Sequence, residues 1–356
     1  MLQVKKGAIP LALLAIASLS AVQAAGCGVG GRTPLKVLCA GSLMVPFERI
    51  EEEYERFHPD VDVIVEGHGS IQVIRYVTEL DARADVMAVA DHSLIPMMMY
   101  DNQVPGTGSD YATWYVRFAT NRLGLAYTSQ SRYANEIDTA NWYDIVSRSD
   151  IELGFPDPRI DSCGYRALML CQLAEGYYED DSILESVLGS FSIPLTVEQE
   201  DETTVIAIPE VLKPTKVTVR GSSVVLLGLL DSGDLDYAFE YESVAKQHGL
   251  RFVELPPEID LSSRSLADAY GHVMVRLDFQ RFASVTPEFF GEPIVYGLTI
   301  PATSPHPEAA EEFVEFLLGP DGYGLLQSCY HPPLVPPEPD NPDSLPSAIR
   351  SVLGLD

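Results

Sequence analysis

Four short polar segments of the sequence stand where a predicted strand gives way to a predicted helix. A helix start presents unpaired backbone N–H groups and the positive end of the helix dipole, and serine adds a neutral hydroxyl donor. Several such starts that converge on one cleft would bind a small dianion without any lysine or arginine. The four segments are Gly41-Ser42, Gly69-Ser70, Asp161-Ser162-Cys163-Gly164 and Gly221-Ser222-Ser223.

Plain helix capping explains the same residue types, because Ser and Asp are favoured at helix starts whether or not a ligand binds. One segment alone is better explained as a cap, whereas four segments, two in each predicted domain, leave capping and binding equally open. Tyr241 would end a strand and could add its hydroxyl to the same cleft, or it could be a half-buried strand tyrosine. The lone histidines are interpreted as surface or capping residues rather than catalysts: His68, His92, His248 and His272.

The segments that must position these residues alternate between short apolar strands and helical patterns, as in parallel β-α-β construction. Residues 35–40 read as a buried strand, and Pro46 opens a helix with Phe47, Ile50, Tyr54 and Phe57 on one face. From Pro332 onward, proline disfavours both helix and central strand. Further strands are predicted at 61–65, 85–90, 123–127, 151–155, 217–220, 235–241 and 294–301, and further helices at 71–80, 224–230 and 307–318 and over a segment that includes Cys163, Cys171 and Tyr177.

Length and composition fit two packed domains. The chain has 356 residues, of which 46% are hydrophobic and 21% charged, so neither a mini-protein nor a disordered chain is expected. The formal charge is -29, from 23 Lys+Arg and 52 Asp+Glu. The electric field of a protein with this negative charge repels phosphate backbones, so we predict no nucleic-acid partner.

The N-terminus has the order of a secretory signal. Lys5 and Lys6 precede an apolar run over residues 8–17, which is shorter than the roughly 20 residues that span a bilayer. A membrane span is the alternative. Residues 24–27 (AAGC) are similar to a lipoprotein processing box, which predicts a signal peptide at 1–26, lipid on Cys27 and a flexible tether at 27–34.

The other four cysteines leave their pairing open. Cys163 and Cys171 are predicted on one helix, where eight residues rise roughly 12 Å. That separation exceeds the reach of a disulfide, so any bridge must be long-range. The remaining two are Cys39 and Cys329.

Six segments, in order along the chain, resemble the archaeal tungstate/molybdate-binding lipoproteins of ABC importers. The likeness runs from about Leu35 to Pro333. It implies an α/β, two-lobed periplasmic-binding-protein fold of type II, in which the chain crosses twice between two doubly wound domains and a hinge encloses the oxyanion. The segments are 38–48 (LCAGSLMVPFE), 69–70 (GS), 90–96 (ADHSLIP), 161–166 (DSCGYR), 237–245 (YAFEYESVA) and 293–301 (PIVYGLTIP).

Carried over by position, the resemblance implies that Gly41, Ser42 and Ser70 bind the oxyanion from the first lobe. Asp161, the amides of Ser162 and Cys163, and Tyr241 bind it from the second lobe. In the family, two carboxylates coordinate the metal itself. Asp161 matches the first, but Ser223 stands where the second, a glutamate, belongs.

This departure bears on the metal's coordination. We expect the Ser223 hydroxyl to donate to an oxo group, which leaves a tetrahedral or five-coordinate oxyanion with Asp161 as a direct W or Mo ligand. The alternative is that Glu240 or Glu242 supplies the second carboxylate.

Together these features predict a lipid-anchored solute-binding protein on the outer face of the membrane. It would capture tungstate or molybdate for an ABC permease, act as a monomer, and neither hold a resident cofactor nor catalyse a reaction. The rivals are a binding protein for sulfate or phosphate and a secreted hydrolase using Asp161 and a histidine. The predicted domains are lobe 1 (35–118 and 294–333), lobe 2 (119–293) and a Pro-rich acidic tail (334–356).

Overall fold

The computed structural model describes residues 31–189, 191, 195–278 and 287–355. The predicted signal peptide and Cys27 lie outside the described residues. The predicted tether ends earlier than expected, because Thr33 and Pro34 already pair with Val61 and Asp62 of the neighbouring strand. Within the described part of the chain, no helix combines the length and apolar character needed to cross a membrane.

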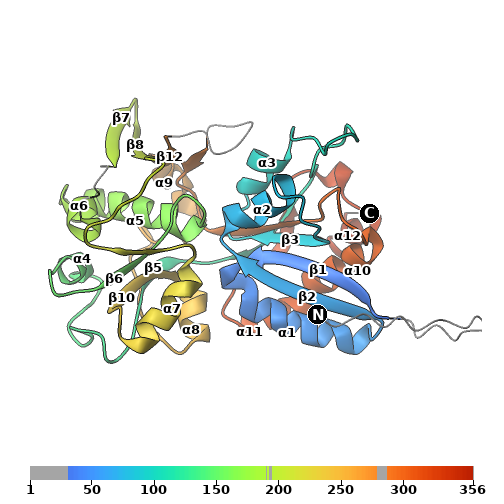
Figure 1. Cartoon of the computed structure of the whole chain (residues 1–356), viewed down its shortest axis with the longest axis horizontal. Helices are drawn as coiled ribbons and strands as arrows, with labels where there is room; N and C mark the ends of the chain where they lie inside the picture. The colour runs from blue at the N-terminus through green and yellow to red at the C-terminus, as the bar shows by residue number, and fades with distance from the viewer. Residues whose placement is uncertain (1–30, 190, 192–194, 279–286, 356) are drawn as a thin grey trace, which may run out of the picture. The chain divides into compact units, whose positions relative to one another are not determined.

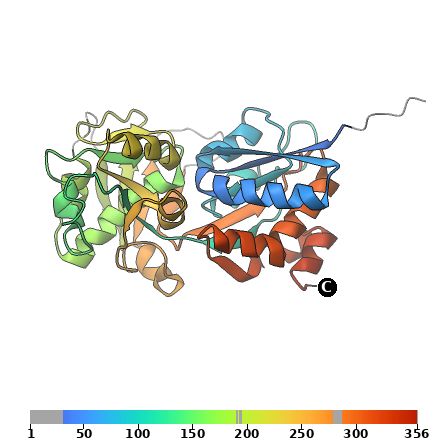
Figure 2. The same cartoon turned by 90° about the horizontal axis from the view of Figure 1, so that it is seen from below.

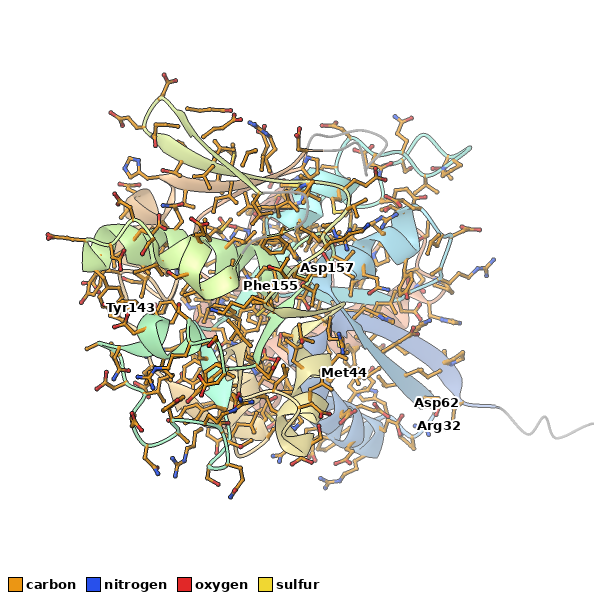
Figure 3. All side chains as sticks on the ribbon, turned by 60° about the vertical axis from the view of Figure 1, so that its left-hand side comes forward. Arg32, Met44, Asp62, Tyr143, Phe155 and Asp157 are labelled. Carbon is orange, nitrogen blue, oxygen red and sulfur yellow. The ribbon has the colours of Figure 1, made fainter. Side chains whose placement is uncertain are left out.

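The first lobe is built on a six-stranded sheet in the order β15-β4-β14-β3-β1-β2. Strand β1 pairs in parallel with β2 and β3, whereas β14 runs antiparallel to β3 and β4, so the sheet is mixed. Directly before β1, Arg32 pairs with Asp62 of β2 at 2.9 Å (Figure 3). The strands are β1 (Thr33–Ala40), β2 (Val61–His68), β3 (Val86–Val89), β4 (Val116–Thr120), β14 (Val295–Thr299) and β15 (Pro333–Pro339).

Helices cover both faces of this sheet, with α1 and α11 on one side of β1 and β2 and with α2 and α3 on the other (Figure 1). Seen from below, α1 lies beside α10 and α11 (Figure 2). In α1, Phe47, Ile50 and Tyr54 are fully buried, but Phe57 is 60% exposed, so its predicted place on the apolar face is wrong. The helical segments are η1 (Gly41–Leu43), α1 (Met44–Phe57), α2 (Ser70–Thr78), α3 (Leu94–Met99), α10 (Pro307–Leu318), α11 (Pro320–Ser328), η3 (Pro342–Ser344) and α12 (Ser347–Val352).

The Pro-rich C-terminal segment belongs to the first lobe. Strand β15 lies at the sheet edge, where proline is tolerated because one side needs no ladder donors. The expectation that no helix forms after Pro332 is wrong, because α12 packs against α10 and buries Ile349 completely. Asp340 accepts a hydrogen bond from the backbone N–H of Tyr115 at 2.7 Å and ties the segment down.

The second lobe contains a five-stranded sheet in the order β11-β5-β10-β6-β9. Its long helix α5 packs against β5, β6 and β10, and it carries Cys163 and Cys171 as predicted. All four described cysteines are buried free thiols. The elements are β5 (Leu123–Tyr127), α4 (Trp142–Val146), β6 (Leu153–Pro156), α5 (Ser162–Tyr178), α6 (Ile183–Leu188), β9 (Thr218–Arg220), α7 (Ser223–Ser232), β10 (Tyr237–Tyr241), α8 (Glu242–Gln247) and β11 (Arg251–Val253).

A further four-stranded sheet, in the order β13-β12-β8-β7, was not predicted. Its outer strand β7 is exposed at every residue and reads TVEQE, so it lacks the apolar signal of a buried strand. The elements are β7 (Thr196–Glu200), β8 (Thr203–Ile208), η2 (Arg264–Leu266), α9 (Ala267–Tyr270), β12 (Val273–Leu277) and β13 (Glu288–Phe290).

The chain passes between the two main sheets twice. It leaves the first sheet after β4, at Asn121 and Arg122, and returns to it before β14. The first crossing lies two residues after the predicted boundary at 118/119, because all of β4 pairs within the first sheet.

Candidate functional site

A small cavity lies where the two lobes meet. Its lining includes every residue predicted to bind an oxyanion except Cys163. The space within the cavity is about 10 Å³, far below the roughly 300–1,000 Å³ typical of sites for drug-sized molecules. It therefore suits a small solute. The lining residues are Ala40, Gly41, Ser42, His68, Ser70, Ala90, Asp161, Ser162, Ser223 and Tyr241.

The lining residues come from strand ends and helix starts, as the sequence pattern predicts. Gly41 and Ser42 follow β1, Ser70 begins α2 after β2, and Tyr241 ends β10. Asp161 immediately precedes α5. Because ligands collect at the carboxyl ends of strands in open α/β sheets, this arrangement places donors from both sheets around one point.

A row of hydroxyl groups crosses the cavity wall. The Ser162 Oγ lies 3.2 Å from the Ser70 Oγ and 3.2 Å from the Tyr241 hydroxyl. The Ser70 Oγ also accepts the backbone N–H of Ala90 at 3.0 Å. Ser70 belongs to the first lobe and Ser162 to the second, so the row joins the lobes.

Asp161 is both the N-cap of α5 and part of the cavity wall. Its Oδ1 accepts the backbone N–H of Cys163 at 2.8 Å, and its Oδ2 accepts that of Ser223 at 3.1 Å. The Cys163 amide, which we expected to donate to the oxyanion, is thus directed at Asp161 in this structure. Burial raises the pKa of Asp161 to about 6, against the lowering effect of these two amide bonds.

A second buried carboxyl lies behind Ser223. The Glu240 Oε1 accepts the Ser223 hydroxyl at 3.0 Å and the backbone N–H of Tyr241 at 2.8 Å. The Ser223 hydroxyl, which we expected to donate to an oxo group, is therefore directed at Glu240 here. Burial raises the pKa of Glu240 to about 8, with a smaller contribution from the charge of Asp161. Its Oε2 is buried and has no hydrogen-bond partner among the described residues.

Glu242, the other alternative for the second carboxylate, is held in ion pairs elsewhere. It lies 2.8 Å from the Lys246 Nζ and 3.5 Å from the Arg122 Nε. These contacts hold Glu242 with basic side chains outside the cavity lining.

Ser42 connects the cavity to the hinge. Its Oγ lies 2.9 Å from the Tyr296 hydroxyl, which accepts the side-chain amide of Asn121 at 2.9 Å. The same amide donates to the Ser243 Oγ at 2.7 Å, and that oxygen lies 3.2 Å from the His331 Nε2. Asn121 and Tyr296 stand at the two chain crossings, so hydrogen bonds link both crossings to the cavity wall.

Sequence reasoning missed two residues at this site. His68 was set aside as a surface or capping histidine, yet it ends β2 and lines the cavity, with its Nε2 2.8 Å from the Glu66 Oε1. Its place directly before Gly69-Ser70 was the signal that could have included it. Arg166 lies behind the wall and donates to the Tyr241 hydroxyl at 3.0 Å. Its position one turn into the predicted helix after Asp161 was the corresponding signal.

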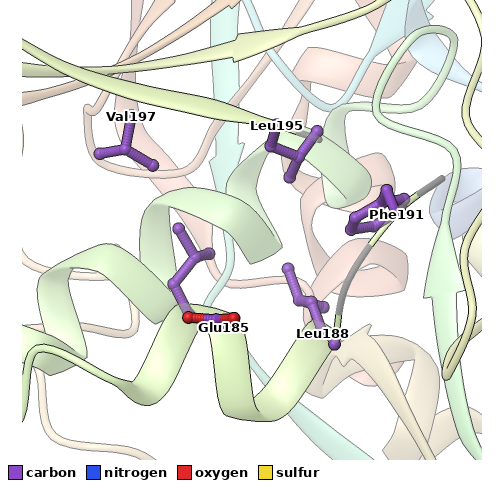
Figure 4. A pocket seen from close by; sticks show the side chains of 7 residues that line it. Glu185, Leu188, Phe191, Leu195 and Val197 are labelled. Atoms are coloured by element: carbon purple, nitrogen blue, oxygen red, sulfur yellow. The ribbon is translucent and has the colours of Figure 1, made fainter. Parts of the chain in front are cut away.

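An apolar hollow lies elsewhere on the second lobe, between α6 and β7 (Figure 4). Leu188, Phe191, Leu195 and Val197 line it, and Glu185 is the one charged residue among the described residues that line it. This chemistry does not suit a small anion, so the cavity between the lobes remains the candidate site.

Comparison with known proteins supports the fold and assigns the family. Residues 35–328 match the family described as bacterial extracellular solute-binding proteins. A solute-binding protein of Methanoculleus marisnigri is 43% identical over 318 residues, covering 89% of this chain and 86% of the relative. The molybdate/tungstate-binding protein WtpA of Pyrococcus abyssi is 36% identical over 343 residues, covering 91% and 94%.

Solved structures confirm the predicted two-lobed α/β fold of type II. The periplasmic molybdate-binding protein of Azotobacter vinelandii aligns with a TM-score of 0.51 at 13% identity, over 83% of this chain and 98% of that one. The sulfate-binding protein SubI of Mycobacterium tuberculosis aligns with a TM-score of 0.53 at 14% identity, over 91% and 96%. With the matched segment spanning both lobes and the cavity between them, the chain belongs to the family of bacterial extracellular solute-binding proteins.

Proposed function

We propose that this protein is the solute-binding component of an ABC importer and that it binds molybdate or tungstate between its lobes. The observation that carries the proposal is a small cavity between the lobes, lined by neutral hydroxyl donors, one buried carboxyl and His68, with no lysine or arginine among the described residues that line it. The name of the relative from Pyrococcus abyssi supports the same solutes.

The buried carboxyl of Asp161 favours a metal oxyanion over other tetrahedral anions. An ionised carboxylate next to a dianion is repulsive unless it bonds to a Lewis-acidic centre. Hexavalent molybdenum or tungsten can accept such a ligand, whereas the sulfur of sulfate cannot. Gly41, Ser42, Ser70, Ser162 and Tyr241 would supply the surrounding donors. The amide of Cys163 and the Ser223 hydroxyl would join them once released from Asp161 and Glu240.

Phosphate is the rival that the same cavity favours most. A protonated phosphate oxygen needs an acceptor, and Asp161 could provide one. Sulfate needs donors only and would leave Asp161 without a favourable role. A hydrolytic reaction at Asp161 and His68 would require a nucleophile activated by the histidine, but the Nε2 of His68 is directed at Glu66.

A binding panel tests the proposal. Purified protein is titrated with tungstate, molybdate, sulfate and phosphate, while heat of binding and melting temperature are recorded. We expect stabilisation by about 4 kcal/mol when the preferred ligand exceeds its dissociation constant roughly a thousandfold. Absence of heat with both molybdate and tungstate would refute the proposal, and heat with phosphate alone would support the rival.

A matched pair of variants assigns the effect to the cavity. Asp161→Ala removes the carboxyl from the site together with a helix cap. Asp180→Ala removes an aspartate that likewise accepts a backbone N–H two residues on, that of Ser182 at 3.0 Å just before α6, and that lies outside the cavity lining. We expect both to lower the melting temperature without ligand, but only Asp161→Ala to weaken binding of molybdate and tungstate.

Export and anchoring extend the proposal. The protein would be processed after residue 26, carry lipid on Cys27, and act as a monomer on the outer face of the membrane with an ABC permease as its partner. It would have no resident cofactor and catalyse no reaction. Fractionation of cells expressing wild type and Cys27→Ser tests the anchor: the wild type should sediment with membranes, and the variant should not.

A further inference from the structure

A buried ion pair joins the two lobes beside the cavity. The Arg166 Nη2 lies 3.2 Å from the Asp91 Oδ2, and the side chains are only 2% and 3% exposed. Asp91 follows β3 of the first lobe, and Arg166 belongs to α5 of the second. Although burial alone would raise the pKa of Asp91, Arg166 and neighbouring donors lower it to about 2, so the pair is charged.

Further contacts of the same residues also cross between the lobes. The Arg166 Nη1 donates to the backbone carbonyl of Ala90 at 2.6 Å, and the Tyr165 hydroxyl donates to the Asp91 Oδ2. Each contact joins α5 to the end of β3. Separation of the lobes would break all of them together.

Arg166 also favours one direction of the hydroxyl row in the cavity wall. A guanidinium can only donate, so the oxygen of Tyr241 accepts from Arg166. The Tyr241 proton is then available to Ser162, and the Ser162 proton to Ser70. Because the Ser70 oxygen already accepts the Ala90 amide, its own proton remains for an acceptor in the cavity.

Contacts between lobes can influence solute affinity without touching the solute. A protein whose binding-competent state is only partly populated binds with its intrinsic dissociation constant divided by that population. Interactions that form only in the closed arrangement raise that population. Their loss therefore weakens every solute that needs the closed state, by the same factor.

We propose that Arg166 is a positioning residue that couples lobe closure to the solute site, pairing with Asp91 across the lobes while it holds Tyr241 as a hydrogen-bond donor. The inference rests on the proposed function where it predicts the affinity for an oxyanion. The closure of the lobes can be measured without any ligand.

Three variants separate the two roles of Arg166. Asp91→Asn removes the charge but keeps an oxygen that can accept from the backbone N–H of Ser93, as Oδ1 does at 3.1 Å. Arg166→Lys keeps a positive charge near Asp91 but cannot hold the Ala90 carbonyl and Tyr241 in the same fork geometry. The control is Asp236→Asn, because Asp236 is also buried and pairs with Arg132 at 3.0 Å, but within the second lobe.

Small-angle scattering and calorimetry give the readouts. We expect Asp91→Asn to increase the radius of gyration of the ligand-free protein and to weaken every bound oxyanion by a common factor of at least about ten, as for a broken buried pair. Arg166→Lys should weaken binding with a smaller change in scattering. Asp236→Asn should change neither, although it lowers stability.

The outcomes distinguish this inference from the proposed function. If wild type binds an oxyanion and both Asp91→Asn and Arg166→Lys bind it equally well, the inference is overturned and the function stands. If wild type binds none of the oxyanions, the function fails, and scattering of the ligand-free proteins still decides whether the pair holds the lobes closed. If Asp91→Asn does not fold, Arg166→Lys decides the positioning role.

Discussion

Gly69 and Ile160 meet across the two lobes at a distance that only glycine permits. A β-carbon on Gly69 would lie 2.4 Å from the carbonyl oxygen of Ile160. Gly69 precedes α2 of the first lobe, and Ile160 directly precedes Asp161 in the second. The backbone of Gly69 has φ -63° and ψ 143°, which any residue adopts, so close approach is the reason for glycine here.

We therefore expect Gly69→Ala to obstruct closure and weaken oxyanion binding by more than about tenfold, because about 1.4 kcal/mol of strain already corresponds to that factor. The melting temperature without ligand should change little, since the lobes can separate slightly. Gly176→Ala in α5 is the control, because its β-carbon would meet nothing within 4 Å. Equal affinity of Gly69→Ala and wild type in calorimetry would contradict the closed arrangement.

The coordination of a bound metal oxyanion should reflect the serine at position 223. We expect X-ray absorption on the tungstate complex to show four or five oxygen neighbours, with at most one carboxylate oxygen, from Asp161. Six neighbours in wild type would show that a second carboxylate oxygen binds. A decrease from six to five in Glu240→Gln would then identify Glu240 as that ligand.

Glu240 should make the stability of the ligand-free protein depend on pH. Its pKa rises from an ordinary 4.5 to about 8 on burial, so the folded state retains a proton that the unfolded state releases. This contribution to stability is complete below about pH 4.5 and is lost as the pH rises through about 8. Glu240→Gln stays neutral, so its melting temperature should fall less than that of wild type between pH 6.5 and 9.

Asp161, with a pKa raised to about 6, is already mostly ionised in the folded state over that pH range. Burial also raises the pKa of Glu292 to about 8, so the comparison with Glu240→Gln, in which Glu292 is unchanged, is what isolates Glu240. Circular dichroism melts of both proteins in matched buffers provide the measurement. A difference in melting temperature that stays constant over the range would contradict the shifted pKa of Glu240.

Tyr296 should contribute to solute binding through Ser42 and the hinge. Tyr296→Phe removes the hydroxyl that links Ser42 to Asn121, and loss of one hydrogen bond of about 1 kcal/mol corresponds to roughly fivefold weaker binding. Tyr54→Phe is the control, because Tyr54 is fully buried and its hydroxyl has no hydrogen-bond partner among the described residues. If titration shows equal effects of the two variants on affinity, the hinge link has no role in binding.

Much of the fold was predictable because its elements carry strong local signals. The predicted strand 123–127 and helix 307–318 agree with β5 (Leu123–Tyr127) and α10 (Pro307–Leu318) at both ends. In both elements the apolar residues are spaced as expected for an element that packs into the core of the protein. Strand β7 has no such period because it is exposed on both faces, and the sheet that contains it was not predicted.

Residue type and order along the chain determined which side chains surround the cavity. The direction of a buried strand and the first turn of the helix that follows it fix the position of a serine or aspartate at the start of that helix. Ser42, Ser70, Asp161 and Tyr241 could therefore be named before any coordinates. Only the tertiary structure decided which partners the polar side chains around the cavity pair with. Arg166 pairs with Asp91, 75 residues earlier, and the Ser223 hydroxyl at the start of α7 donates to Glu240 on β10. Such partners depend on how the lobes and strands pack. A local sequence pattern does not determine the distance between segments that lie far apart in the chain.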